Sequence, residues 1–382
     1  MELHATRRYC LGSQQFPLPT TVSAADGPVE RCKGSRVGHL VKITNTGAEI
    51  ACGVGVTILE AALDAGIPYP HGCQSGNCGA CKSHLLDGAV TLDGYSDFAL
   101  MDEERDRGLI LACRAVPDSA CEVAWLDEDD LIVHPRRILA TTVVAIDDAT
   151  HDIKRVLLAV SSGGPFTFSA GQFASVTFDG APPRDYSMAN PPGASLLEFH
   201  IRRMAGGNTS AHVATQVKLG DKVRVEGPFG TSYLRESHRG PILAIAGGSG
   251  LAPIKSIVEQ ALALKMPQPI HLYFGARDER GLYLVEHFAA LAAAHPTLRF
   301  TPVLSDPEGA TTRRTGFVHE IAGRDLADLD GCKAYIAGPP VMVEAATRLL
   351  LARGLRRIDV HADAFYTAAE MQEAGRKTGA QM

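Results

Sequence analysis

The chain has 382 residues, of which 45% are hydrophobic and 21% charged, and its formal net charge is -6. This length exceeds what a single hydrophobic core organises, so we expect two or three domains. The composition is typical of a globular protein, and no apolar run reaches the ~18 to 20 residues that a membrane-spanning helix needs. We therefore expect no role within a membrane.

Acidic residues concentrate near the start of the chain. Residues 38–130 contain 16 Asp or Glu and 5 Lys or Arg, a local net charge of -11, whereas the rest of the chain is slightly basic. This distribution argues against nucleic-acid binding and favours an acidic docking face for a basic partner protein. The alternative is that the acidity only keeps a small domain in solution.

Residues 1–36 are predicted to be a polar N-terminal extension. They contain the pair Arg7-Arg8 but no apolar core of the length that a secretory signal requires. Nine cysteines is an odd number for a disulfide framework, so we expect a chain of the reducing cytoplasm. The clustered thiols then need another explanation.

Residues 38–127 are predicted to form a small α+β domain. A helix is expected to begin at the capping box formed by Thr57 and Glu60 and to end near Gly66. Apolar runs predict strands at residues 39–45, 49–55, 109–117 and 120–126. The acidic run 127–130, followed by the sequence HPRR, is typical of a linker.

Three cysteines lie within nine residues, in the sequence CQSGNCGAC. Cys73, Cys78 and Cys81 have C-x4-C-x2-C spacing, and Cys113 follows after a further 31 residues. This is the plant-type spacing of ligands to a 2Fe-2S cluster, and glycines between them let backbone N–H groups turn toward the sulfurs. A structural zinc site is the alternative, but zinc usually takes two similarly spaced pairs. The sequence GCQSGNCGACKSHLLDG resembles that of plant-type ferredoxins, which implies a β-grasp fold.

Residues 134–237 are predicted to form an antiparallel β-barrel. The sequences QFASVTF, LLEFHIRRM and DKVRVEGPF alternate apolar and polar residues, with Gly and Pro between the runs. Each of these segments is long enough for one strand. The alternation indicates one buried and one exposed face.

The sequence RDYS resembles the R-x-Y-S motif of the ferredoxin-NADP reductase superfamily, whose barrel binds flavin. The resemblance implies that Arg184 contacts flavin phosphate, Tyr186 packs on the isoalloxazine ring, and Ser187 hydrogen-bonds near N5 in catalysis. Members of this superfamily with a ferredoxin domain at the N-terminus, which this chain resembles, generally carry FAD, so we expect FAD rather than FMN. The region HIRRMAGGNTSAHV then supplies a strand along the flavin and a helix start for the pyrophosphate, and GPFGTSYLR closes the barrel. The implied cofactor-binding positions in that region are His200, Ile201, Arg202, Gly207, Asn208, Thr209 and Ser210.

Residues 240–366 alternate strand-like and helix-like runs, which predicts a doubly wound parallel sheet of about five strands. A glycine-rich turn follows the first of these strands and precedes a helix, where backbone N–H groups can hold a pyrophosphate. Its predicted cofactor-binding residues are Gly247, Gly248, Ser249, Gly250, Ala252 and Pro253. The last residues, 367–382, are predicted to be a frayed tail.

The sequence AGPPVM resembles the superfamily's second nucleotide motif, C-G-P-P-x-M. Gly338 and Pro339 match it and are expected to shape the nicotinamide pocket, but Ala337 replaces the usual Cys, so a thiol role does not carry over. The resemblance places Phe365 near the flavin as a catalytic residue; the alternative is a simple core position. The pair Ser305-Asp306 contains an acidic residue that would repel the 2'-phosphate of NADPH, which favours NADH. Nearby arginines could compensate for this charge, so NADPH stays an alternative. These arginines are Arg277, Arg280, Arg313 and Arg314.

Over residues 38–366 the chain resembles the reductase component of aromatic-ring-hydroxylating Rieske oxygenases, of the naphthalene, benzoate or terephthalate type. This implies an NAD(P)H oxidoreductase whose FAD splits an electron pair for the 2Fe-2S cluster, which then reduces a terminal oxygenase or an intermediate ferredoxin. Reductases of di-iron monooxygenases for phenol, toluene or methane have the same module order and are the first alternative. A sugar-deoxygenation reductase and a redox-sensing regulator are further ones.

Overall fold

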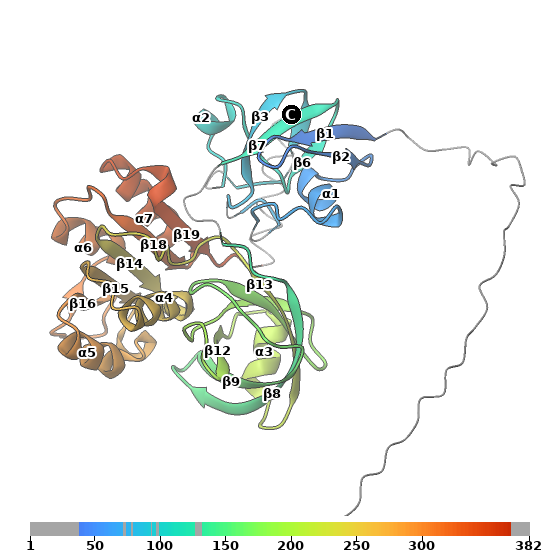
Figure 1. Cartoon of the computed structure of the whole chain (residues 1–382). Helices are drawn as coiled ribbons and strands as arrows, with labels where there is room; N and C mark the ends of the chain where they lie inside the picture. Colours follow the sequence, from blue (N-terminus) through green and yellow to red (C-terminus); the bar gives the residue numbers. More distant parts are fainter. Residues whose placement is uncertain are drawn as a thin grey trace, which may run out of the picture. The chain divides into compact units, whose positions relative to one another are not determined.

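The computed structural model describes residues 38–71, 74–77, 79–92, 94–96, 99–126 and 132–367. The predicted extension 1–36, most of the linker after residue 126 and the tail from residue 368 lie outside the described residues. Within the described ranges, no helix is long and apolar enough to cross a membrane. The described residues form three sheet-based domains in chain order (Figure 1).

The first domain is built on a five-stranded sheet with the order β2-β1-β7-β3-β5. Strands β1 and β7 are parallel and the other neighbours are antiparallel. A separate pair, β4 and β6, is antiparallel. The strands are β1 His39–Ile43, β2 Ala48–Cys52, β3 Lys82–Asp87, β4 Val90–Leu92, β5 Leu109–Leu111, β6 Ala115–Pro117 and β7 Cys121–Trp125, and the helices are α1 Ile58–Asp64 and α2 Asp102–Arg105.

Helix α1 begins where the sequence predicts it. The Thr57 hydroxyl accepts from the backbone N–H of Glu60 at 3.2 Å, and Ile58, Leu59 and Ala62 are buried in the domain core. The prediction of one strand over 109–117 is wrong. The chain leaves β5 after Leu111, turns through a bond from the Arg114 N–H to the Leu111 carbonyl, and enters β6 in the other sheet. This turn brings Cys113 back toward Cys81.

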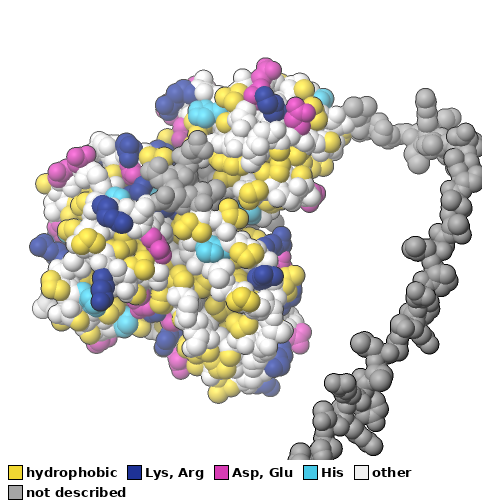
Figure 2. Space-filling model, in the orientation of Figure 1, with side chains coloured by type: hydrophobic (Ala, Val, Ile, Leu, Met, Phe, Trp, Pro, Cys, Tyr) yellow, Lys and Arg dark blue, Asp and Glu magenta, His cyan; other side chains and the backbone are white. Residues whose placement is uncertain are grey.

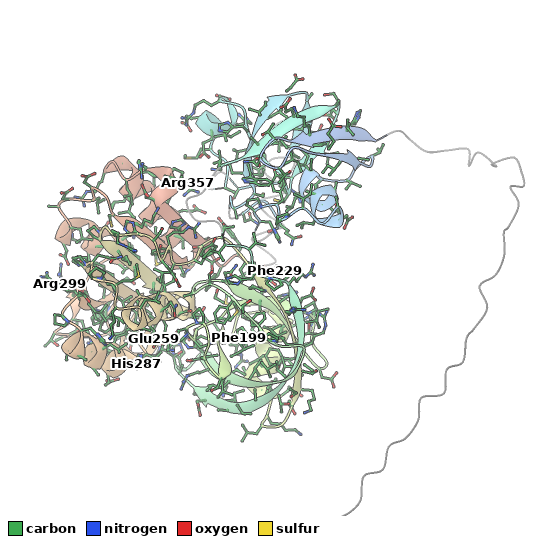
Figure 3. All side chains as sticks on the ribbon, viewed as in Figure 1. Phe199, Phe229, Glu259, His287, Arg299 and Arg357 are labelled. Atoms are coloured by element: carbon green, nitrogen blue, oxygen red, sulfur yellow. The ribbon has the colours of Figure 1, made fainter. Side chains whose placement is uncertain are left out.

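The second domain is a nearly closed antiparallel barrel with the strand order β11-β10-β13-β8-β9-β12. A bridge between Met188 and Phe199 links its two edges. Alternate residues of β10 are buried, as the apolar-polar alternation predicts, and Phe199 lies inside the barrel (Figure 3). The elements are β8 Arg137–Asp148, β9 Ile153–Ser162, β10 Phe173–Phe178, β11 Arg184–Ser187, β12 Leu196–Arg202, α3 Asn208–Thr215 and β13 Lys222–Phe229.

The third domain has a parallel sheet with the order β17-β16-β15-β14-β18-β19, six strands instead of the predicted five or so. Helices α4 and α5 pack on one face of the sheet and α6 and α7 on the other (Figure 1). Strand β14 is buried on both faces, so it reads as a continuous apolar run. The elements are β14 Ile242–Gly247, α4 Leu251–Ala263, β15 Ile270–Ala276, α5 Val285–Ala294, β16 Leu298–Leu304, β17 Arg314–Thr315, α6 Val318–Asp325, β18 Lys333–Gly338, α7 Pro340–Ala352 and β19 Val360–Ala364.

These domains confirm the predicted fold class of a β-grasp domain, an antiparallel barrel and a doubly wound parallel sheet. The additional sixth strand is β17, which has only two residues. So short a strand carries no detectable alternation in the sequence. On the face shown in Figure 2, acidic and basic side chains are interspersed, and the acidic docking face stays a prediction.

Candidate redox and nucleotide site

Two of the four predicted cluster ligands lie in the described part of the first domain. Cys81 and Cys113 are both buried, and the backbone N–H of Cys113 donates to Sγ of Cys81 at 3.4 Å. Backbone N–H groups that donate to ligating sulfurs are a usual feature of iron-sulfur sites, so this contact suits an iron ligand. Cys73 and Cys78 lie outside the described residues.

The described part of the cysteine loop has a backbone that favours glycine. Gly76 and Gly79 have positive φ angles of 79° and 72°. A Cβ at Gly76 would lie 2.8 Å from the Gly94 carbonyl oxygen, so a larger residue does not fit there. The described part of the loop is therefore tightly wound next to Cys81, as a loop that supplies three of four thiolates to two irons must be, and the residues present fit a 2Fe-2S cluster.

A buried ion pair that the sequence did not reveal lies directly after Cys81. Lys82 Nζ is 2.6 Å from Oε2 of Glu104, and both side chains are almost fully buried. Burial, together with the nearby Arg357, lowers the pKa of Lys82 to about 8, against the opposing effect of Glu104. The pair joins the short helix α2 to β3 and so braces the strand that follows the cysteine loop.

The R-x-Y-S residues lie on β11 along a cavity of ≈ 1370 Å³. Arg184 is exposed, Tyr186 is half-buried, and Ser187 is buried with its hydroxyl 3.3 Å from Oδ2 of Asp363. Burial raises the pKa of Tyr186 to about 12, so its hydroxyl stays protonated at neutral pH. All three residues line the cavity, whose size suits a dinucleotide; the donor set of cation, aromatic ring and hydroxyl fits FAD.

Asp363 is a site residue that sequence reasoning missed. It lies on β19 in the third domain, 176 positions from Ser187, and it lines the same cavity. A carboxylate that accepts from the Ser187 hydroxyl fixes the direction of that hydroxyl. Nothing in the local sequence marks Asp363, since only the fold brings the two strands together.

Strand β12, which is predicted to run along the flavin, has side chains in three different environments. Ile201 is buried in the barrel core. His200 contacts Glu198 and Tyr283, and Arg202 donates from Nε to Oδ2 of Asp152 at 2.7 Å. The side chain of Ile201 is therefore turned away from the cavity, and only its backbone can face a flavin there. Arg202 and His200 still line the cavity.

The predicted pyrophosphate helix start is present as α3. Gly207 precedes its first turn, and Asn208 is its first residue. The Thr209 hydroxyl donates to the Pro182 carbonyl at 2.7 Å, and the Ser210 hydroxyl accepts from the Met204 N–H at 3.0 Å. Because these two hydroxyls have protein partners, the backbone N–H groups and the Asn208 amide are the donors of this helix start that suit a phosphate.

The glycine-rich turn is packed against the second nucleotide motif. A Cβ at Gly250 would lie 2.1 Å from the Ala337 carbonyl oxygen, and one at Gly338 would lie 2.7 Å from that of Gly247. Close backbone packing is thus one reason for these glycines, beside any contact with phosphate. Ser249 and Ala252 line the cavity, whereas Pro253 is buried in α4.

The C-terminal end of β18 contacts a residue near the end of the described chain. The backbone N–H of Phe365 donates to the Gly338 carbonyl at 2.9 Å, and Phe365 is half-buried beside the core while lining the cavity. Pro339 precedes α7, and Ala337 is buried in β18. Phe365 thus packs against the core and also lines the cavity. Its side chain can offer a flavin an aromatic face, but no hydrogen-bonding or charged group.

Three family models match consecutive parts of the chain. The 2Fe-2S iron-sulfur cluster binding domain matches residues 41–118, the oxidoreductase FAD-binding domain matches residues 140–233, and the oxidoreductase NAD-binding domain matches residues 244–348. The predicted cofactors, a 2Fe-2S cluster, FAD and a nicotinamide dinucleotide, are confirmed at this level.

Two curated relatives match most of the chain. The chain is 41% identical over 313 residues to the reductase component of naphthalene 1,2-dioxygenase/salicylate 5-hydroxylase systems of Ralstonia sp., covering 82% of this chain and 94% of that one. It is 38% identical over 343 residues to the reductase component of phenol 2-monooxygenase of Pseudomonas sp. strain CF600, covering 87% and 96%.

A solved structure is also similar over most of the chain. A cytochrome P450 reductase of Amycolatopsis matches with a TM-score of 0.70 and 35% identity, covering 87% of this chain and 99% of that one. The protein is an oxidoreductase. The chain belongs to the ferredoxin–NAD(P)+ reductase components that join a 2Fe-2S domain to FAD- and NAD-binding domains, the family that includes the reductases of naphthalene dioxygenase systems.

Proposed function

We propose that the protein carries electrons from NADH to the terminal oxygenase, or to the intermediate ferredoxin, of an aromatic-ring-hydroxylating dioxygenase system. The observation that carries the proposal is the 41% identity, over 82% of this chain, to a reductase component of such a system. Bound FAD supplies the chemistry that joins a two-electron donor to a one-electron acceptor. In keeping with this role, we also place the protein in the reducing cytoplasm.

The chain's own residues bind and orient the cofactors. Cys73, Cys78, Cys81 and Cys113 hold the cluster, and Arg184, Tyr186 and Ser187 hold the flavin. The hydrogen bond from Ser187 to Asp363 fixes the direction of the Ser187 hydroxyl. This supports a place for that hydroxyl beside the reacting edge of the flavin ring. Phe365 closes the cavity from the third domain. The glycine-rich turn and Gly338 hold the nicotinamide dinucleotide.

Reconstitution tests the function. The purified protein, loaded with iron, sulfide and FAD, is combined with NADH and a Rieske naphthalene-type oxygenase, with and without its ferredoxin, and dihydrodiol product is measured per NADH consumed. We expect coupled product formation. Rapid NADH oxidation with cytochrome c but none with the Rieske components would contradict the proposed acceptor.

The reductase of a di-iron monooxygenase is the second candidate. The match to the phenol 2-monooxygenase reductase extends over 343 residues, longer than the 313 residues matched in the dioxygenase relative, though at lower identity. The same assay with a phenol hydroxylase in place of the Rieske oxygenase separates the two. Coupled phenol hydroxylation, without dihydrodiol formation in the parallel assay, would favour this candidate.

We propose NADH as the preferred donor. The Asp306 carboxylate is exposed, and Oδ2 lies 3.8 Å from Nη2 of Arg277, whereas Arg313 and Arg314 are engaged by Glu279 and Asp325. Asp306→Arg should therefore raise the ratio of kcat/KM for NADPH to that for NADH by roughly tenfold, since a repelling charge becomes an attracting one.

Steady-state kinetics with both nucleotides check this prediction. Asp306→Asn is the matched control, because it removes the charge without adding a cation, and it should change the ratio by a smaller factor. A wild-type protein that already prefers NADPH would contradict the assignment.

A further inference from the structure

A chain of buried polar side chains runs from the flavin barrel to the glycine-rich turn. Oε1 of Glu198 lies 3.0 Å from Nε2 of His200, both on β12. Nδ1 of His200 lies 2.9 Å from the hydroxyl of Tyr283, which comes from the loop before α5. That hydroxyl lies 3.4 Å from the Gly248 carbonyl oxygen. These contacts therefore join side chains of the barrel to the backbone of the glycine-rich turn in the third domain.

The protonation states of these side chains decide which group donates each hydrogen bond. Burial alone would raise the pKa of Glu198, but bonds from His200 and Arg155 and the charge of Lys255 hold it well below its usual range. Burial lowers the pKa of His200, so the imidazole is neutral. A neutral imidazole that donates from Nε2 to a carboxylate must accept at Nδ1. The single proton of the Tyr283 hydroxyl is then donated to His200 at 2.9 Å, and it reaches the Gly248 carbonyl oxygen at 3.4 Å as the longer branch of a three-centre hydrogen bond.

A second set of contacts holds α4, the helix that follows the turn, against the same part of the barrel. Nζ of Lys255 lies 3.1 Å from Oε2 of Glu198 and 3.2 Å from the Ala189 carbonyl oxygen, and the Ser256 hydroxyl donates to the Asn190 carbonyl at 2.7 Å. Nζ of Lys255 is also 3.0 Å from Glu259, whose other oxygen meets His287 at 2.7 Å. Figure 3 shows Glu259 and His287 next to each other in the third domain.

The shape of the turn itself depends on other contacts. Gly250 and Gly338 pack the turn against the C-terminal end of β18, entirely within the third domain. Loss of the Tyr283 hydroxyl leaves this backbone packing in place. It removes only the link between the Gly248 carbonyl and β12. The two effects, pyrophosphate binding and placement against the flavin strand, are therefore separable.

We propose that Tyr283 is a positioning residue. Through His200 it holds the glycine-rich turn at a fixed place beside β12, and in this way it places the nicotinamide against the flavin ring. The inference rests on NAD(P)H oxidation at the bound flavin, as the proposed function does. It does not depend on which protein accepts the electrons. A failure of the oxygenase assay would leave it standing, and its own failure would leave the acceptor untouched.

Tyr283→Phe tests the proposal, because it removes the hydroxyl and keeps a ring that packs against Phe274. In anaerobic stopped-flow experiments with the FAD-loaded protein, flavin reduction at saturating NADH should slow about tenfold, as expected for lost orientation. The dissociation constant for NAD+, measured by calorimetry on the oxidised protein, should stay within about twofold of wild type.

Tyr335→Phe is the matched control. Tyr335 is a buried tyrosine of the same domain whose hydroxyl accepts from the Arg235 N–H, and it lies outside the chain described above. It should leave flavin reduction within about twofold of wild type. The proposal is overturned if Tyr283→Phe reduces its flavin at the wild-type rate, if only NAD+ affinity changes, or if Tyr335→Phe produces an equal fall.

A pair of variants at His200 keeps the proposal testable if Tyr283→Phe does not fold. His200→Asn retains a side-chain oxygen that can accept from the Tyr283 hydroxyl, whereas His200→Leu has no acceptor. Flavin reduction should be faster in the Asn variant than in the Leu variant by several-fold, with similar NAD+ affinity. Equal rates in the two variants would contradict a positioning role for the hydroxyl.

Discussion

Cys113→Ser is expected to abolish NADH-driven reduction of cytochrome c while NADH still reduces the bound flavin at its wild-type rate. Cys113 is one of four predicted iron ligands and lies in the first domain, whereas the flavin and nicotinamide residues lie in the other two. Loss of a thiolate ligand removes the one-electron exit without touching hydride transfer. We expect a fall of roughly 100-fold or more in the cytochrome c assay.

Cys121→Ser is the control for this experiment. Cys121 is as buried as Cys113 and lies in the same domain, but its thiol donates to the Ala89 carbonyl at 3.3 Å, away from the cysteine loop. Its replacement should leave iron and sulfide content, visible spectrum and cytochrome c reduction unchanged. A Cys113→Ser protein that keeps its iron and full cytochrome c activity would show that this cysteine is no ligand.

Lys255→Met is expected to lower the thermal midpoint of the flavin-bound protein by about 10 °C. The Lys255 and Glu198 side chains are almost fully buried, and removing one partner leaves a buried charge less well compensated. Such losses cost about 3–5 kcal/mol, and each kcal/mol shifts the midpoint of a unit this size by roughly 2–4 °C. The midpoint is read from the rise in flavin fluorescence on release.

Arg324→Met is the matched control, because it also replaces a cation with methionine. Arg324 faces Glu320 at 3.7 Å, but both side chains are largely exposed. Exposed pairs contribute about 0–1 kcal/mol, so the midpoint should move by only a few degrees at most. An equal shift in both variants would contradict a special contribution from the buried pair.

The pH dependence of stability follows from the same carboxylate. The pKa of Glu198 is held below its usual value in the folded protein, so its contribution to stability is full above the unfolded pKa of about 4.3 and is lost as pH falls through the folded pKa. Without Lys255 the folded pKa rises. The acid-dependent loss of stability should therefore be smaller in Lys255→Met than in wild type and should end at a higher pH, with its onset near the unfolded pKa in both proteins, as thermal scans across the acid range would show.

The sequence by itself determined what depends on local spacing. The cysteine spacing predicted the 2Fe-2S domain, the alternation in residues 134–237 predicted the barrel, and the glycine-rich turn before α4 predicted the nucleotide-binding sheet. Each of these signals lies within one element or one turn, where the residue order and the geometry are directly linked.

Only the tertiary structure decided the contacts between distant segments. Asp363 reaches Ser187 across 176 positions, and Tyr283 reaches His200 across 83, because β19 and the loop before α5 are brought to the barrel by the fold. The break in the strand predicted over 109–117 has the same origin, since Cys113 turns back toward Cys81. Side chains that meet in this way are separated by no regular number of residues. A periodic pattern in the sequence therefore cannot predict these contacts.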